Sequence, residues 1–142
     1  MIRIDVRTKY NHIPIIAAQI RPAVSQVVKK TAYDVEADVK TEMAERPKHG
    51  RLYGSHSRGM GLLHQASAPG EAPAVDTGLL INSIQVENVT DLTSTVGTNV
   101  EYATPLEFGS RRIAARPVWR KVLEARRKPF IQAITFVLRQ LK

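Results

Sequence analysis

Apolar residues recur at steps of four or seven along the first third of the chain, as they do on one face of an α-helix. This stripe consists of Ile16, Ile20, Val24, Val28, Val35, Val39 and Met43. It predicts a long helix that continues to about Glu45. Pro22 lies inside the stripe, and a proline within a helix removes one hydrogen bond at a cost of about 3 kcal/mol. We therefore expect a kink or a new helix start at Pro22.

Three other segments have the pattern of β-strands. Residues 2–7 alternate between apolar and polar side chains, and residues 83–89 do the same. Residues 92–97 are rich in threonine and valine and follow Asp91, a common turn residue. Segments 83–89 and 92–97 are therefore expected to form an antiparallel hairpin.

The last third of the chain predicts two more helices. A short one runs from Glu101 to Phe108, with Gly109 as a left-handed stop, and Pro117 opens a longer one that Pro129 breaks or restarts. The apolar stripe of the longer helix consists of Phe130, Ile134, Val137, Leu138 and Leu141. The fold class is therefore α+β, with one small antiparallel sheet, made of the N-terminal strand and the central hairpin, packed by the two long helices. At 142 residues the whole chain, 1–142, is expected to be a single domain.

Residues 46–73 contain five glycines and three prolines and show no clear period. Loops of this length in compact domains are usually functional or disordered. We expect a long flexible loop, with a hairpin as one form, that becomes ordered against a partner; plain disorder is the alternative.

The net charge of +8 is concentrated at the C-terminal end. Residues 111–142 contain ten basic residues and one acidic residue, which favours a polyanion or an acidic protein surface as a neighbour. A solvated helix face is the alternative. The late turns of the first helix are acidic and are the natural partner of this basic tail, within one subunit or between neighbours. The candidate interface residues are Asp38, Glu42, Glu45, Arg126, Arg127 and Lys128.

Few residues suggest catalysis or a cofactor, and we expect neither. The chain has no cysteine, its four histidines lack the spacing of a zinc site, and no P-loop or nucleophile elbow is present. The N-terminus lacks a signal-peptide core and no run is long enough to span a membrane, so we expect a soluble protein made in the cytoplasm. No specific nucleic-acid module is visible, although non-specific contact with phosphates is an alternative.

Three motifs follow one another in the second half of the chain. Residues 74–84 read Ala-Val-Asp-Thr-Gly-Leu-Leu-Ile-Asn-Ser-Ile, residues 102–110 read Tyr-Ala-Thr-Pro-Leu-Glu-Phe-Gly-Ser, and residues 115–118 read Ala-Arg-Pro-Val. In order and spacing this set resembles the motifs of the tail-completion or neck protein family of long-tailed bacteriophages. The chain departs from that pattern with alanine for proline at 74, serine for threonine at 110 and valine for phenylalanine at 118.

These motifs favour architecture over chemistry. Asp76 is expected to cap a helix, Gly78 to allow a tight turn, and Glu107 to pair with one of the arginines that follow it. Tyr102 and Phe108 are expected to pack between sheet and helix. The scaffold residues of the motifs are Asp76, Thr77, Gly78, Tyr102, Glu107, Gly109 and Pro117.

The resemblance implies a structural role at the head–tail junction of the virion, assembled in the host cytoplasm. It implies a self-assembled ring, a hexamer in the virion, between connector or head-closure proteins and the tail terminator or tail tube. A ring requires two different complementary surfaces on each subunit. Our hypothesis is that the acidic and basic candidates above meet across the subunit boundary. A passing contact with DNA is expected of the same junction protein. A tail terminator and a basic, non-specific nucleic-acid-binding module are the alternative functions.

Overall fold

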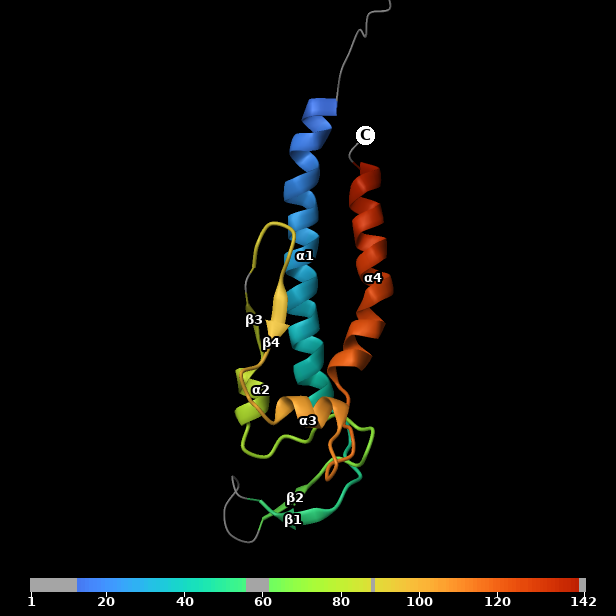
Figure 1. Cartoon of the computed structure of the whole chain (residues 1–142). Helices are drawn as coiled ribbons and strands as arrows, with labels where there is room; N and C mark the ends of the chain where they lie inside the picture. The colour runs from blue at the N-terminus through green and yellow to red at the C-terminus, as the bar shows by residue number, and fades with distance from the viewer. Residues whose placement is uncertain (1–12, 56–61, 88, 141–142) are drawn as a thin grey trace, which may run out of the picture.

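Two long helices lie side by side and form the body of the protein (Figure 1). The structure, a computed structural model, describes residues 13–55, 62–87 and 89–140 of the chain. α1 (Ile13–Ala44) and α4 (Trp119–Gln140) run in opposite directions along the long axis of the molecule. The two long helices predicted from the apolar stripes are therefore present.

Both long helices pass through a proline without interruption. Pro22 lies inside α1 and Pro129 inside α4, so the new helix start expected at Pro22, and the break or restart expected at Pro129, were wrong. Both prolines are exposed, and the apolar stripe continues on either side of each. Packing of the flanking turns therefore outweighs the hydrogen bond that each proline removes.

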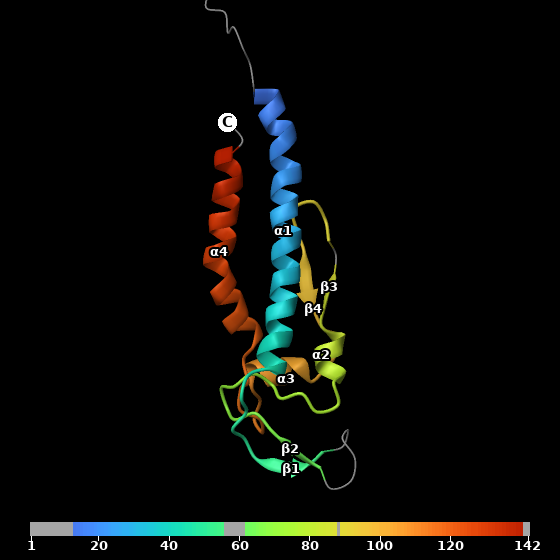
Figure 2. The same cartoon turned by 180° about the vertical axis from the view of Figure 1, so that it is seen from behind.

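The described strands form two separate two-stranded sheets instead of one. β1 (Leu52–Gly54) pairs with β2 (Leu63–Gln65), and β3 (Gln85–Glu87) pairs with β4 (Thr95–Gly97), both antiparallel. The β3–β4 pair is the predicted central hairpin, and it lies beside α1 on the side away from α4 (Figures 1 and 2). The β1–β2 pair shows that the 46–73 segment contains a hairpin. The expected strand at 2–7 lies outside the described residues.

The hydrophobic core lies where the end of α1 meets the start of α4. Two short helices, α2 (Leu79–Ser83) and α3 (Ala103–Phe108), lie close to this junction (Figure 1). The core cluster consists of Val35, Val39, Met43, Ala72, Ile84, Val118 and Val122. It joins the last turns of α1 to the first turn of α4 and to the segments between them. The α+β class predicted from the sequence is confirmed.

Candidate functional site

Glu107 connects α3 to the start of α4. Its side chain is 7% exposed, and its carboxylate accepts the backbone N–H groups of Val118 and Trp119 on Oε2, at 2.7 and 3.1 Å. The N–H of Arg120 donates to Oε1 at 2.9 Å. The first N–H groups of a helix have no partner inside it, and a carboxylate there also interacts favourably with the helix dipole. Glu107 therefore caps α4 from a different element.

The predicted pairing of Glu107 with a nearby arginine was wrong. The loop after α3 folds back, with the N–H of Arg116 donating to the carbonyl of Leu106 at 2.6 Å, so that the start of α4 reaches the carboxylate. The side chain of Arg116 instead donates to the carbonyl of Ser67 at 3.2 Å. Pro117 is buried and precedes the helix by two residues, so it does not itself open α4.

Gly109 allows the chain to leave α3 and turn back. Its φ is +82° and its ψ is 171°, so its φ is positive as predicted while its ψ lies outside the left-handed helical region. A Cβ at this position would lie 3.1 Å from the backbone nitrogen of Ala115 and 3.2 Å from the carbonyl oxygen of Ile113. The glycine is therefore required both by its φ and by the close approach of the returning loop.

Asp76 holds the β1–β2 hairpin against the body, and the prediction that it caps a helix was wrong. Its Oδ1 accepts the hydroxyl of Ser55 at 2.9 Å and lies 4.0 Å from Nδ1 of His64. His64 is 4% exposed and packs edge-to-face against Tyr53, with ring centroids 5.1 Å apart. The N-cap of α2 is Gly78, with φ +80°, so the predicted tight turn at this glycine is confirmed. Thr77 contributes its hydroxyl oxygen, which accepts the N–H of Leu79 at 3.3 Å.

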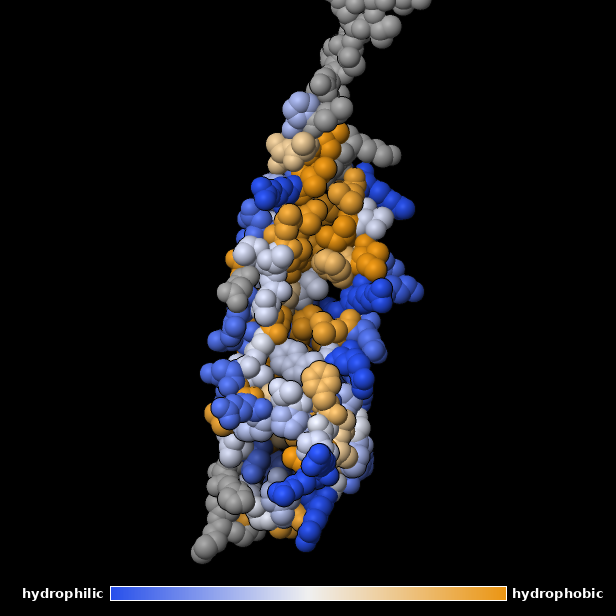
Figure 3. Space-filling model, in the orientation of Figure 1, coloured by the Kyte–Doolittle hydropathy of each residue, from blue (hydrophilic) through white to orange (hydrophobic). Residues whose placement is uncertain are grey.

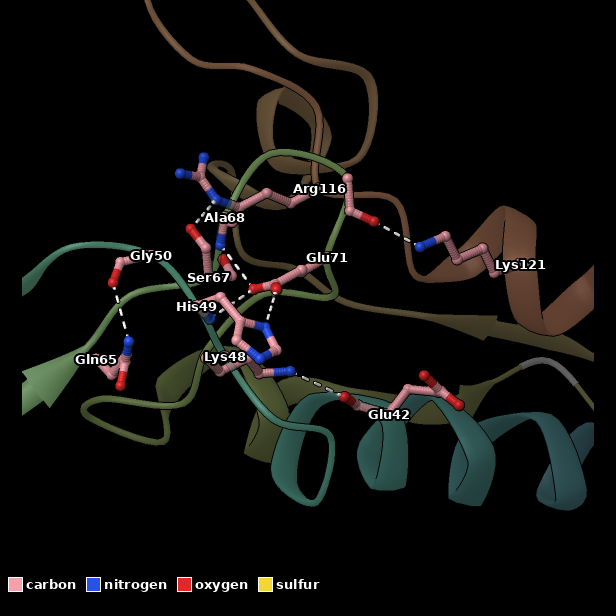
Figure 4. A network of polar contacts seen from close by, with 11 residues as sticks. Glu42, Lys48, His49, Gly50, Gln65, Ser67, Ala68, Glu71, Arg116 and Lys121 are labelled. Atoms are coloured by element: carbon pink, nitrogen blue, oxygen red, sulfur yellow. Dashed lines mark hydrogen bonds and ion pairs between the residues drawn. The ribbon is translucent and has the colours of Figure 1, made fainter.

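Glu71 organises the rest of the 46–73 segment (Figure 4). Its carboxylate accepts the N–H of Ala68 at 2.7 Å and the N–H of His49 at 3.1 Å, and it contacts Nδ1 of His49 at 2.6 Å. These bonds, the one from Ala68 first, lower the pKa of Glu71 to about 2. Next to it, Lys121 of α4 donates to the carbonyl of Gly70 at 2.5 Å. The segment is thus tied to α4.

The charged candidates on the two long helices meet within one chain. The guanidinium of Arg126 donates to both carboxylate oxygens of Asp38, with Nη2 2.7 Å from Oδ1, and its Nη1 lies 3.3 Å from Oδ2 of Asp34. The hydrogen bond from Arg126 lowers the pKa of Asp38, and the pKa of Arg126 is raised in return. The hypothesis that Arg126 and Asp38 meet across a subunit boundary is therefore corrected.

The other candidate charges differ in their surroundings. Glu42 pairs with Arg46 at 2.9 Å, one turn further along the chain. Glu45, Arg127 and Lys128 are exposed. Arg127 and Lys128 therefore remain accessible on α4 after Arg126 has been used to join the helices.

The prediction that Tyr102 and Phe108 pack between sheet and helix was wrong. Tyr102 is 44% exposed and Phe108 is 76% exposed, because α3 turns Glu107 towards the interior instead. Phe108 lines an open apolar hollow with a volume of about 470 Å³, together with Trp119 and Leu123 of α4 and Val96 of β4. The side chains of Tyr102 and Phe108 are therefore accessible to a partner.

The polar side chains described above connect helices, hairpins and loops to one another. Within the described ranges, no group of three or more histidine, aspartate or glutamate side chains is close enough to hold a metal ion. Across the same part of the chain, no helix is long and apolar enough to cross a membrane. Comparisons of the chain with family models, curated proteins and solved structures found no match.

Proposed function

We propose that the protein is a structural component of the head–tail junction of a long-tailed bacteriophage, where it acts as a neck or tail-completion protein. Copies form a ring, a hexamer in the virion, that joins the capsid connector to the tail tube. The tail terminator is the neighbouring role within the same structural class. The resemblance of the three motifs to that family supports this proposal, and so does the use of their polar residues.

The motif residues connect elements to one another. Asp76 bonds Ser55 of the segment that carries the β1–β2 hairpin, and Glu107 caps α4 from α3. Gly78 and Gly109 supply the positive φ angles at which the chain turns. These roles in holding elements together support a function in architecture.

The observation that carries the proposal is a group of large apolar side chains exposed on those halves of the two long helices that lie away from the core. Ile15 on α1 is 56% exposed, and Ile131, Phe136 and Leu138 on α4 are 54%, 63% and 46% exposed. Figure 3 shows apolar surface extending over this part of the molecule. Continuous apolar surface is typical of protein–protein contact sites. We call these four residues the distal apolar group.

A gene-deletion experiment tests the proposal. In the phage or prophage that encodes the chain, deletion is expected to leave DNA-filled heads and complete tails that do not join, as seen by negative-stain electron microscopy. A plasmid copy should restore joined particles. Intact virions without the gene, or a lysate without filled heads, would contradict a role in joining.

Substitutions in the distal apolar group test whether these residues are needed for joining heads to tails. Ile131→Asp combined with Phe136→Asp should abolish complementation while the far-UV circular dichroism spectrum stays unchanged. Tyr33→Asp is the matched control, because Tyr33 is 58% exposed but lies outside the group. We expect it to complement normally, and equal behaviour of the two variants would remove the support that this group provides.

A further inference from the structure

The two sides of α1 carry opposite charge. Residues 72–110, which contain α2, the β3–β4 hairpin and α3, include five acidic residues and no lysine or arginine. α4 carries six basic residues and one acidic residue. The hairpin and α4 lie on opposite sides of α1 in both views (Figures 1 and 2). Three of the five acids, Glu87, Asp91 and Glu101, are exposed, and Asp91 pairs with Arg21 of α1 at 3.7 Å. The hairpin side therefore offers Glu87 and Glu101 as exposed acids, and the α4 side is basic.

The acidic side exposes charged and apolar groups together. Val86 and Val96 are paired and half-buried, so the neighbouring Glu87 projects from the outer face of the hairpin, where it is exposed. Leu79 on α2 is 58% exposed and Leu92 in the hairpin turn is 48% exposed. The exposed residues of this hairpin side are Leu79, Glu87, Val89, Asp91, Leu92 and Glu101.

The outer face of α4 is matched to this surface in charge and in apolar content. Val122 is buried and Arg126 is bonded to α1, so the residues about half a turn away point outward. At the 3.6-residue period, this α4 outer face consists of Arg120, Glu124, Arg127, Ile131 and Leu138, all exposed. Lys128 is exposed next to it.

We propose that the hairpin side of one copy binds the α4 outer face of a second copy. Opposite charges align the two surfaces and disfavour contacts between identical sides, and the apolar residues on each add buried area. The contact joins two different surfaces, so it continues from copy to copy, and it gives a closed ring when the rotation between neighbours closes on itself. This inference rests on the proposed function, to which it adds the two surfaces through which copies meet.

The absence of cysteine from the chain allows a direct test by site-specific cross-linking of the full-length protein. One preparation carries Glu87→Cys and another carries Arg127→Cys, and the two are mixed with a short bismaleimide. We expect heterodimers from the mixture and few dimers from either variant alone. A chain with both substitutions should give a ladder of higher oligomers, because each copy then links to two neighbours.

The control replaces Arg127→Cys by Ala37→Cys, on an exposed part of α1 outside both surfaces. We expect its yield with Glu87→Cys to be at least about tenfold lower, and the heterodimer yield to fall severalfold at about 1 M salt, where the Debye length is about 3 Å. A heterodimer yield no higher than the control, or dimers formed mainly by Glu87→Cys alone, would overturn the contact. A yield that does not fall with salt would overturn its electrostatic basis.

The two proposals fail separately. If cross-linking fails while gene deletion still leaves unjoined heads and tails, the junction role stands and these surfaces are wrong. If deletion yields intact virions while the heterodimers form, the chain self-associates through these surfaces in another structure.

Discussion

Removal of the Glu107 carboxylate should destabilise the protein more than any loss of an ordinary helix cap. In Glu107→Ala, the N–H of Val118 is left buried without its acceptor, and those of Trp119 and Arg120 lose theirs in partly buried positions. Substitution of a cap usually costs about 1 kcal/mol and at most about 2 kcal/mol. A buried donor without a partner costs about 1–3 kcal/mol, while water can replace the carboxylate at the two partly buried donors.

The buried N–H of Val118 and the two partly buried N–H groups together give an expected loss of about 3 kcal/mol in the free energy of unfolding. This is a large share of the roughly 5–15 kcal/mol that stabilises a typical domain. At about 3 °C per kcal/mol, the melting temperature should fall by about 10 °C. Glu107→Gln keeps one acceptor oxygen at nearly the same place but loses the charge, so we expect about half of this loss.

Urea unfolding followed by circular dichroism at 222 nm measures both variants. Glu101→Ala is the control, because Glu101 is exposed and lies just before α3, and it should stay within about 0.5 kcal/mol of the wild type. If Glu107→Ala does not fold, Glu107→Gln still provides a measurable value. A loss for either Glu107 variant that does not exceed that of Glu101→Ala would refute the capping role.

Three further predictions concern the bonds that fix the loops and helices. Because the pKa of Glu71 in the folded protein is about 2, below its ordinary value of 4.5, its contribution to stability is complete above that ordinary value and is lost as the pH falls towards 2. The melting temperature of Glu71→Gln should therefore fall less than that of the wild type between pH 5 and pH 2.5, and parallel curves would contradict this. A double-mutant cycle of Asp38→Ala and Arg126→Ala should give a coupling of about 1 kcal/mol that weakens in high salt, since both side chains are partly exposed; zero coupling would mean that the pair adds nothing. Gly50→Ala should lower the free energy of unfolding by about 2 kcal/mol, because a Cβ there would lie 2.6 Å from two backbone carbonyl oxygens. Gly54→Ala is the control, because a Cβ at that position would have nothing within 4 Å. Equal unfolding free energies of the two variants would contradict the close approach at Gly50.

The elements that the sequence predicts well are those with a local signal. The apolar stripe of α1 and the alternation around Val86 depend only on neighbours along the chain, and both elements are present. Asp76 and Glu107 were assigned local roles by the same reasoning, as a cap and as an ion-pair partner. Their actual partners lie 21 and 11–13 residues away, and only the folded path of the chain brings them together.

The error in the sheet has a similar origin. The alternation of a strand predicts which residues share a face, but it does not identify the strand with which it pairs. Within strands β1 and β2 themselves, His64 is the only buried residue, so these segments have no apolar pattern by which they could have been recognised as strands. Glu71 was missed for the same reason, since its value as an anchor depends on how that segment folds.

The internal ion pairs also decide which charges are available to another molecule. Arg126 forms ion pairs with Asp34 and Asp38. Glu36 pairs with Lys40, and Glu42 pairs with Arg46. Four of the five acidic residues from Asp34 to Glu45 are thus engaged within the chain, and Glu45 stays exposed, although the sequence alone made the whole set the obvious partner for the basic tail of another subunit. The exposed acids that remain opposite α4 are on the hairpin side, at Glu87 and Glu101. In the proposed ring, we therefore expect the outer face of α4 to meet the hairpin side of its neighbour, because Asp34, Glu36, Asp38 and Glu42 already have partners within the chain.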